Sequence, residues 1–189
     1  MEAQIARANL IFSGTGIAFT LAALSTDGTL PAHVRTRMER HALGASLTPG
    51  AIHVIAVKTL HDVDEAGRFR SGVHWKVRGS AQPQWQVAAP ARSTLPCSCR
   101  SLLAASDVPC AVRPHLIILA KKADRDVLAH ELGHFFGNRV HDHTPGNVMS
   151  YVAGEADVPV FTKAQVQRVQ ETAACLVRRG ELVPSTQHP

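Results

Sequence analysis

Two histidines four residues apart, His130 and His134, flank a glutamate in the run His130-Glu131-Leu132-Gly133-His134. Residues at this spacing lie on one face of a helix, so both imidazoles can reach the same ion. Glu131 lies next to that ion without needing to be a ligand. Its carboxylate is therefore free to take a proton from a metal-bound water. This is the chemistry of zinc-dependent peptide hydrolysis.

The residues that follow extend this pattern. Gly137 comes three positions after His134, where a chain that leaves a helix needs a left-handed residue. Further on, the run 147–151 contains a methionine, Met149, with a tyrosine two residues later. Residues 130–151 as a whole resemble the metzincin family of zinc peptidases, which share an extended HExxHxxGxxH motif and a Met-turn. The Met-Ser-Tyr sequence looks most like the turn of the astacin and serralysin groups.

The third histidine departs from the family pattern by one position. Val140 occupies the expected place, His141 follows one residue late, and His143 follows three late with Asp142 between them. We expect a one-residue bulge after the glycine, with Asn138 as a second left-handed residue, to bring His141 to the metal. His143 is the alternative third ligand, and Asp142 is the least favoured of the three.

The resemblance also implies a role for each of five residues. His130 and His134 would be metal ligands, and Glu131 would be the general base and later the proton donor to the leaving amine. Met149 would form a hydrophobic floor beneath the metal without binding it, and Tyr151 would approach the metal or stabilise the oxyanion. Tyr151 could instead be a core tyrosine with a satisfied hydroxyl. The implied cofactor is Zn²⁺, which lowers the pKa of a bound water towards about 7.

Other interpretations of the metal helix remain open. A gluzincin-type peptidase would use a downstream glutamate as third ligand, and Glu155, 21 residues after His134, or Glu171 would serve. Gly137 and the Met-turn sequence argue against that version. A zinc-containing binding protein of the same fold without catalytic activity is a different class of protein, and a toxin domain with peptidase activity is a third possibility.

Length and composition fit a single domain over 1–189 with enough residues to bury a core. No apolar run approaches the ~20 residues that cross a bilayer. The first residues lack a basic segment followed by an apolar one, so we expect no signal peptide, and the compartment stays open between the cytoplasm and a mature domain of an exported protein. The net charge of +5 is scattered along the chain, which indicates a solvated surface and not a nucleic-acid site. We expect a monomer that acts on a protein or peptide.

Four cysteines occur, at positions 97, 99, 110 and 175. The spacing of Cys97 and Cys99 is wrong for a common zinc knuckle. A disulfide from either of them to Cys110 is plausible in an oxidising compartment. Cys175 lies on an apolar helix face, where we expect an inert core thiol, although it could reach one of the other three.

The hydrophobic periodicity and the turn residues predict a mixed order of helices and strands. The expected elements are a helix over 2–13, a strand over 17–24, a helix from Pro31 to about His41 closed by Gly44, a strand over 52–57, two short alternating runs over 73–77 and 84–87 of which one could be a sheet edge, a loop over 94–114 around a short helix at 100–105, a strand over 116–119, the metal-site helix capped by Asp124 or Asp126, and a last helix from the Thr162-x-x-Gln165 capping box to Gly180.

This order predicts an α/β fold with a mixed twisted sheet. The resemblance to metzincins implies an upper subdomain, 1–137, that holds the sheet and the zinc helix. A small helical lower subdomain, 138–183, would hold the Met-turn and the C-terminal helix, and 184–189 would be a flexible tail. Substrate would lie extended in the cleft between the subdomains and pair with an antiparallel edge strand.

Overall fold

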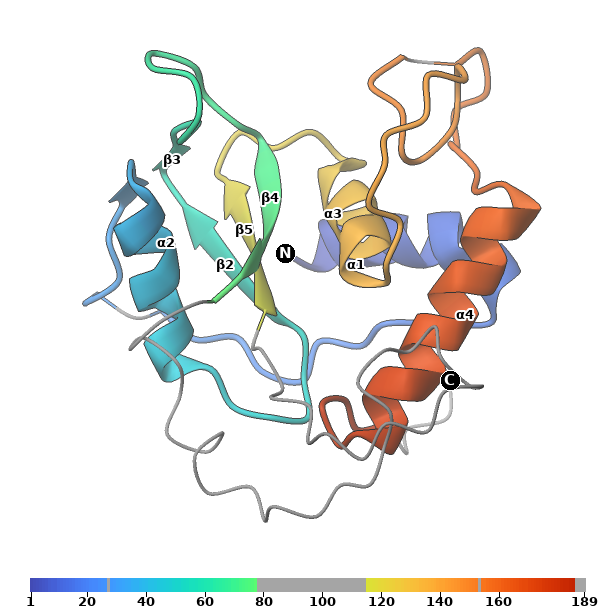
Figure 1. Ribbon diagram of the computed structural model, residues 1–189, viewed down its shortest axis with the longest axis horizontal. Helices are drawn as coiled ribbons and strands as arrows, with labels where there is room; N and C mark the ends of the chain where they lie inside the picture. The colour runs from blue at the N-terminus through green and yellow to red at the C-terminus, as the bar shows by residue number, and fades with distance from the viewer. Residues whose placement is uncertain (27, 78–114, 153, 186–189) are drawn as a thin grey trace, which may run out of the picture.

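The computed structural model describes residues 1–26, 28–77, 115–152 and 154–185. Within these residues the protein is mixed α/β, with four α-helices and a small mixed sheet (Figure 1). Several sequence predictions lie outside the described residues: the run 84–87, the segment 94–114 with its short helix, Cys97, Cys99, Cys110 and the residues 186–189 of the tail.

The described elements follow one another in a simple order. They are α1 (Glu2–Phe12), the short 3₁₀ helix η1 (Ser13–Thr15), β1 (His33–Val34), α2 (Arg37–Ala42), the 3₁₀ helix η2 (Leu43–Ser46), β2 (His53–Val57), β3 (Thr59–Leu60), β4 (Gly72–Lys76), β5 (His115–Ala120), α3 (Val127–Phe135) and α4 (Lys163–Arg178).

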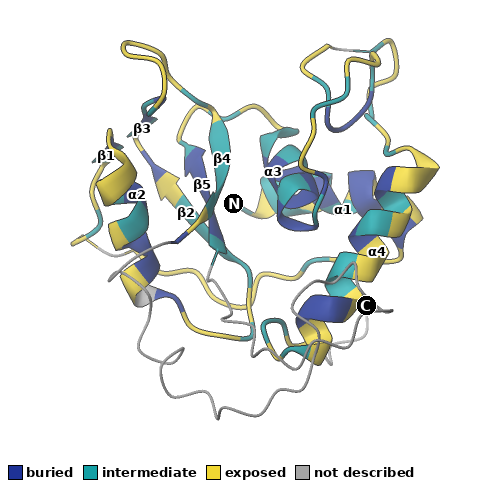
Figure 2. Cartoon of the chain, viewed as in Figure 1, coloured by how far each residue is buried: buried dark blue, intermediate teal, exposed yellow. Residues whose placement is uncertain are grey.

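The main sheet has the strand order β2-β5-β4. β2 runs parallel to β5, with His53 opposite Leu116, and β4 runs antiparallel to it, with Val73 opposite Ile118. β5 is the most buried strand, as expected for an apolar strand with both faces covered (Figure 2). β4 is therefore an antiparallel edge of the described sheet, which confirms the edge prediction for the run 73–77. β1 and β3 pair separately as a two-stranded parallel sheet.

The two faces of β5 pack against different helices. Ile117 and Leu119 belong to a core cluster with residues of α1 and α3, and Leu116 and Ile118 belong to a second cluster that includes Leu43 after α2. In Figure 1 α1 and α3 accordingly lie on one side of the sheet and α2 on the other. Burial of each of these side chains contributes about 1.5–3 kcal/mol, so α3 is held firmly in place beside the sheet.

The predicted strand over 17–24 is wrong, because these residues form no regular element. The backbone N–H of Phe19 donates to the Asn9 side-chain oxygen over 2.7 Å, and its carbonyl accepts from the Asn9 amide over 2.9 Å. An α1 side chain therefore takes the place of a neighbouring strand. Ile17 and Phe19 alternate in the sequence because both pack against the core next to α1.

The predicted helix from Pro31 to about His41 begins later than expected. Thr36 caps α2, with its hydroxyl accepting from the Glu39 N–H over 3.1 Å and the Glu39 carboxylate accepting from the Thr36 N–H over 2.9 Å. This capping box fixes the start of the helix more strongly than Pro31 does. Gly44, expected to close the helix, instead lies within η2.

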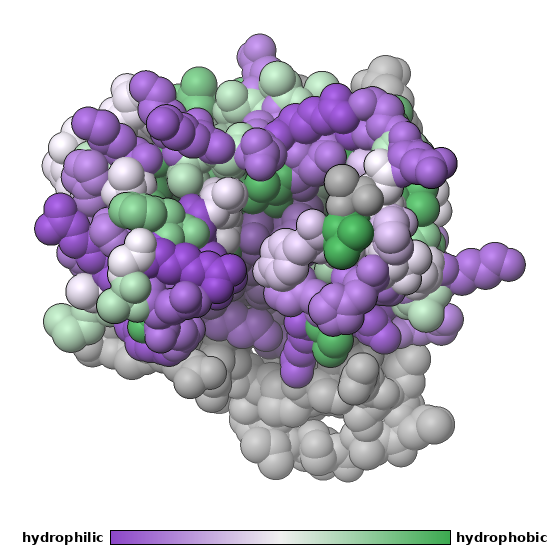
Figure 3. Space-filling model, turned by 90° about the horizontal axis from the view of Figure 1, so that it is seen from above, coloured by the Kyte–Doolittle hydropathy of each residue, from purple (hydrophilic) through white to green (hydrophobic). Residues whose placement is uncertain are grey.

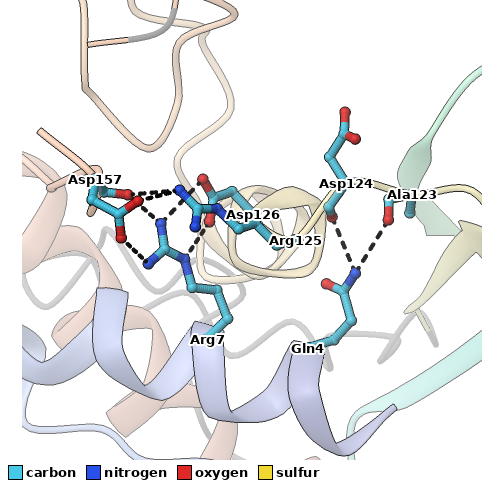
Figure 4. A network of polar contacts seen from close by, with 7 residues as sticks. All are labelled: Gln4, Arg7, Ala123, Asp124, Arg125, Asp126 and Asp157. Carbon is cyan, nitrogen blue, oxygen red and sulfur yellow. Dashed lines mark hydrogen bonds and ion pairs between the residues drawn. The ribbon is translucent and has the colours of Figure 1, made fainter. Parts of the chain in front are cut away.

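The start of α3 is tied to α1 by ion pairs (Figure 4). Asp126 takes the N-cap position, but neither it nor Asp124 caps the helix with its side chain. The Asp126 carboxylate instead accepts a hydrogen bond from the Arg7 Nε over 2.5 Å, and Arg7 also forms an ion pair with Asp157 at 3.3 Å. Arg125 pairs with the same Asp157 carboxylate at 2.5 Å. The network thus links α1, the start of α3 and the loop that follows α3.

The last helix agrees with its sequence signals. The Thr162 hydroxyl accepts from the Gln165 N–H and the Gln165 side chain bonds back to the Thr162 N–H, which confirms the capping box. The chain turns away after α4 at Gly180, whose φ is 69°. Cys175 is disulfide-bonded, so the prediction of an inert core thiol is wrong. None of the described helices is long and apolar enough to cross a bilayer.

Candidate metal centre

Helix α3 carries the first two histidines on one face. Leu128, Leu132 and Phe135 are buried against the sheet and α1, so the helix cannot rotate without exposing them. His130 and His134 then lie one turn apart, with ring centroids 4.8 Å from each other. The amphipathic pattern of the helix therefore decides the direction in which both imidazoles point.

The end of α3 turns the chain back towards these histidines. Gly137 has a φ of 94°, as the motif predicted, and its N–H bonds to the His134 carbonyl over 3.1 Å. The Asn138 N–H reaches the Gly133 carbonyl over 2.9 Å, which completes a Schellman motif. The prediction of a left-handed Asn138 is wrong, because no described residue other than glycine has a positive φ. Val140, which occupies the place of the third histidine in the family pattern, is 80% exposed.

Three histidines meet at one point as a result. Ring nitrogens of His130, His134 and His141 all lie within 4.8 Å of one another, and this is the group among the described residues that could hold a metal ion. The Nε2 atoms of His134 and His141 are 3.2 Å apart. His143 is exposed and lies outside the group, as do the exposed carboxylates of Glu155 and Glu171. Among the alternatives from the sequence, the structure brings His141 to the other two.

The hydrogen bonds of the two helix histidines suit metal binding. His130 Nδ1 lies 2.8 Å from the Val148 carbonyl, and His134 Nδ1 lies 2.6 Å from the Asn138 carbonyl. A ring nitrogen beside a carbonyl must carry the proton, which leaves Nε2 of each ring with a free lone pair. Burial lowers the pKa of His130, and lowers that of His134 to about 4, so both rings are in the neutral form that a metal requires.

Met149 lies directly beneath the helix, in a turn over 147–150 closed by the Ser150 N–H and the Asn147 carbonyl at 3.0 Å. The methionine side chain is fully buried. A Cβ at Gly133 would lie only 2.4 Å from its sulfur, so the glycine in the middle of the histidine motif is what lets Met149 pack there. The buried methionine thus packs against the middle of helix α3.

The turn is fixed from below by α4. Asn147 and Gln165 exchange two side-chain hydrogen bonds, of 2.9 and 3.1 Å, and the Asn147 oxygen also accepts from the Met149 N–H over 2.8 Å. Gln165 is the third residue of the α4 capping box, so one side chain both caps the helix and holds the turn. Since the carbonyl of the neighbouring Val148 orients His130, this pair also contributes to the geometry of the metal centre.

Glu131 lies on the inner side of the same helix, with 7% of its surface exposed. Its carboxylate accepts a hydrogen bond of 2.7 Å from the backbone N–H of His74 in β4. Burial raises its pKa to about 7, although this hydrogen bond acts in the opposite direction. A carboxyl group with such a pKa can both take up and release a proton near neutral pH.

Tyr151 lies at the open side of the cluster. Its hydroxyl is 2.8 Å from His141 Nε2, and its ring centroid is 5.5 Å from that of His130. The side chain is 69% exposed, so the alternative of a core tyrosine is wrong. Its hydroxyl is therefore placed next to the atom through which His141 would bind an ion.

Two residues of the site carry no sequence signal. Asp62 has a nearly buried carboxylate that accepts from the Arg70 Nε over 2.7 Å and from the Asp64 N–H over 2.9 Å. The charge of Arg70 in turn affects the pKa values of the Tyr151 hydroxyl and of His141, in addition to the larger effect of burial. Both residues precede the motif by about 60 positions, and no spacing rule connects them with it.

A second histidine pair, from β4 and β5, lies next to Phe135 of α3. His74 Nε2 and His115 Nδ1 are 2.8 Å apart, and the His115 ring stacks on Phe135 at 4.0 Å. Burial lowers the pKa of His74 to about 2 and that of His115 to about 3, so both are neutral. Both residues are half-buried.

The surface of the molecule is hollowed between two loops. The loop between β3 and β4 and the loop between α3 and α4 stand up on either side of this hollow (Figure 1). Seen from above, the surface is hollowed between these two parts of the molecule, and hydrophilic side chains predominate around the hollow (Figure 3).

Comparison with known proteins adds no further information on the site. No family model, curated protein or solved structure matches the chain.

Proposed function

We propose that the protein is a zinc-dependent endopeptidase. The observation that carries the proposal is the meeting of three histidine nitrogens, from His130, His134 and His141, beside the buried carboxylate of Glu131 on the same helix. A purely structural zinc site is closed by four protein ligands, whereas a catalytic site keeps one position open. Three histidines next to an acid–base group fit the second kind.

Zinc is the metal that these ligands suit best. Neutral imidazoles whose other nitrogen is bonded to a carbonyl are common zinc ligands, and the three ligands leave room for a fourth. When bound, such an ion supplies Lewis acidity, which makes a water molecule more acidic and polarises a carbonyl oxygen.

Glu131 supplies the acid–base chemistry. Burial raises the pKa of its carboxyl group to about 7, so the carboxylate can accept a proton from the attacking water near neutral pH. The same carboxyl group then holds that proton for the leaving amine nitrogen. The His74 N–H keeps one oxygen in place, so the carboxylate enters the reaction already oriented.

Tyr151 supplies a hydrogen bond to the developing oxyanion. The Tyr151 hydroxyl lies next to His141, but the side chain is exposed and does not pack in the core. The hydroxyl can therefore turn from the histidine to a substrate oxygen. A donor placed where negative charge develops stabilises the transition state more than the ground state.

Strand β4 offers a surface for an extended peptide. In an antiparallel edge strand, the backbone N–H and carbonyl groups of every second residue point away from the neighbouring strand. The His74 N–H bonds to Glu131 and not to β5, so His74 is one of these residues in β4. The carbonyl of His74 and the backbone groups of Gly72 face the same way. A substrate strand that paired with this edge would lie beside Glu131. A hollow that is open to the surface can take a peptide whose chain continues on both sides of the cleaved bond.

The proposal is tested by metal analysis combined with digestion of a peptide library. We expect about one zinc per chain, cleavage of internal bonds, loss of cleavage after chelation and recovery with zinc. Cleavage that persists after proven removal of the metal would exclude a metallopeptidase. One zinc per chain without cleavage of any peptide would favour the catalytically silent binding protein.

A further inference from the structure

Arg70 is held in a fixed position on the wall of the hollow. It lies in the loop between β3 and β4, where its N–H bonds to the Leu60 carbonyl over 2.8 Å. Its Nε donates to Asp62 over 2.7 Å, and the Asp62 side chain is only 2% exposed while that of Arg70 is 38% exposed. One edge of the guanidinium is thus fixed by a buried carboxylate, and the other edge remains accessible.

Arg70 lies close to the reaction centre. Burial raises the pKa of the Tyr151 hydroxyl and the charge of Arg70 opposes that rise, while burial lowers the pKa of His141 and the charge of Arg70 adds to that fall. Tyr151 itself is within 2.8 Å of His141. Arg70 therefore lies one residue further from the metal centre than Tyr151 does.

Arg70 shares its buried carboxylate partner with a second guanidinium. Asp62 is one carboxylate between two guanidinium groups, because the buried Arg40 also lies close to it. Arg40 is held by the His61 carbonyl at 2.6 Å and by the Trp75 ring at 4.8 Å, so it cannot turn away into water. Asp62 therefore cannot pair with Arg70 alone, because Arg40 lies on its other side.

We infer that Arg70 binds a carboxylate of the peptide substrate close to the scissile bond, which makes the protein selective for substrates with an acidic group there. The inference rests on the proposed peptidase function. A guanidinium whose one edge is fixed presents its remaining N–H groups in the fork that a carboxylate accepts. Its place beyond Tyr151 suits a group next to the reacting carbonyl and not the oxyanion itself. The carboxylate can be an acidic side chain or the chain terminus.

Matched peptides test the inference. One pair carries Glu or Gln next to the cleaved bond with an amidated C-terminus, and a second pair has a free or amidated C-terminus without an acidic side chain. We expect kcat/KM of the wild type to favour the acidic member of one pair by about 10- to 100-fold, the effect of one charge-assisted bidentate contact. The pair that shows the preference identifies the source of the carboxylate.

Variants assign the preference to Arg70. In Arg70→Ala the ratio of acidic to neutral peptide should fall to about one, and Arg70→Lys, which keeps the charge next to Asp62 but loses the fork, should give an intermediate ratio. Arg68→Ala is the matched control, because Arg68 lies in the same loop but is paired with Glu65 and exposed; it should keep the wild-type ratio. An unchanged ratio in Arg70→Ala, with both peptides slowed equally, would overturn the inference and assign Arg70 to the oxyanion.

A binding measurement separates this inference from the proposed function. Two hydroxamates that differ only by a carboxylate or its amide are titrated into the zinc-loaded protein by calorimetry. We expect the carboxylate to bind at least about tenfold more tightly, and Arg70→Ala to remove the difference. Equal affinity in the wild type would overturn the role of Arg70. Absence of hydrolysis with this difference intact would overturn only the proposed peptidase activity.

Discussion

The backbone N–H of His74 donates to the Glu131 carboxylate over 2.7 Å and so joins the edge strand β4 to the metal helix α3. Gly72 makes this approach possible, because a Cβ there would lie 2.6 Å from Val127 and 3.0 Å from Glu131. The strand proposed to bind substrate and the residue proposed to move protons are therefore fixed relative to each other by one hydrogen bond and one missing side chain.

Glu131→Gln should abolish hydrolysis and leave the metal bound. The amide can still accept from His74 but cannot take up a proton, so we expect kcat to fall by about 10²- to 10⁴-fold. Zinc content, measured by mass spectrometry, should stay near that of the wild type because Glu131 is not a ligand. Full activity in this variant would contradict its role as general base, and loss of zinc would make it a ligand.

Tyr151→Phe should lower kcat more than it changes KM. Removal of one oxyanion donor costs roughly tenfold to a thousandfold in turnover. Since the side chain is 69% exposed, the free energy of unfolding should change by less than about 0.5 kcal/mol. Val152→Ala, a truncation at the next exposed residue, is the control for the loop. If turnover of Tyr151→Phe equals that of the wild type, the hydroxyl has no part in the chemistry.

Gly133→Ala should destabilise the protein through its contact with Met149. Overpacking costs about 1–3 kcal/mol, against a gain of up to about 1 kcal/mol from the better helix propensity of alanine. Urea unfolding should show the loss, whereas Gly14→Ala, where a Cβ meets no atom within 4 Å, should not. In the double variant with Met149→Ala, the two effects should be non-additive by about 0.5–3 kcal/mol. Additive effects would place the methionine elsewhere.

The sequence predicts the local parts of this site well, because each has its signal within a few residues. The spacing of His130 and His134 needs only the helical period, and Gly137 needs only its left-handed backbone. The capping box at Thr162 is equally local. Each of these features is fixed by the chain before the fold is complete, and the structure agrees with all three.

The remainder of the site depends on contacts between distant segments. Arg70 comes close to Tyr151 and His141 through the loop between β3 and β4, and Asp62 holds it there; the sequence contains no period or motif that reports this. The same holds for the segment 17–24, whose alternation suggests a strand although Asn9 binds its backbone. Asn138, expected to be left-handed, is instead buried and bonded to Arg168 over 3.0 Å. Tertiary partners decide these conformations.

Acid should destabilise the metal-free protein through His74 and His115. Both are neutral in the fold, with pKa values lowered to about 2 and about 3, whereas the unfolded chain takes up protons below about 6.5. Stability is therefore lost as the pH falls from about 6.5 towards 3. Glu131, with a pKa raised to about 7, acts in the opposite direction, since its contribution is lost as the pH rises through that value.

His115→Gln should weaken this pH dependence. Removal of one such histidine should reduce the loss of unfolding free energy between pH 7 and pH 5 by about 1–2 kcal/mol. Urea unfolding in the presence of a chelator measures it, and His143→Gln, a change at an exposed histidine, should leave the loss as it is in the wild type. Equal pH dependence in wild type and His115→Gln would show that the pair titrates normally.

His141→Ala should cost far more metal affinity than His143→Ala. His141 Nε2 lies 3.2 Å from His134 Nε2 and belongs to the three-histidine group, whereas His143 is exposed outside it. Two histidines alone do not hold zinc firmly in an otherwise open site, so loss of the third should weaken binding by orders of magnitude. Competition with a zinc-binding dye measures both variants on one scale. A reversed order would make His143 the ligand, and equal affinities would require a third ligand outside 141–143, with Glu155 the first carboxylate to replace.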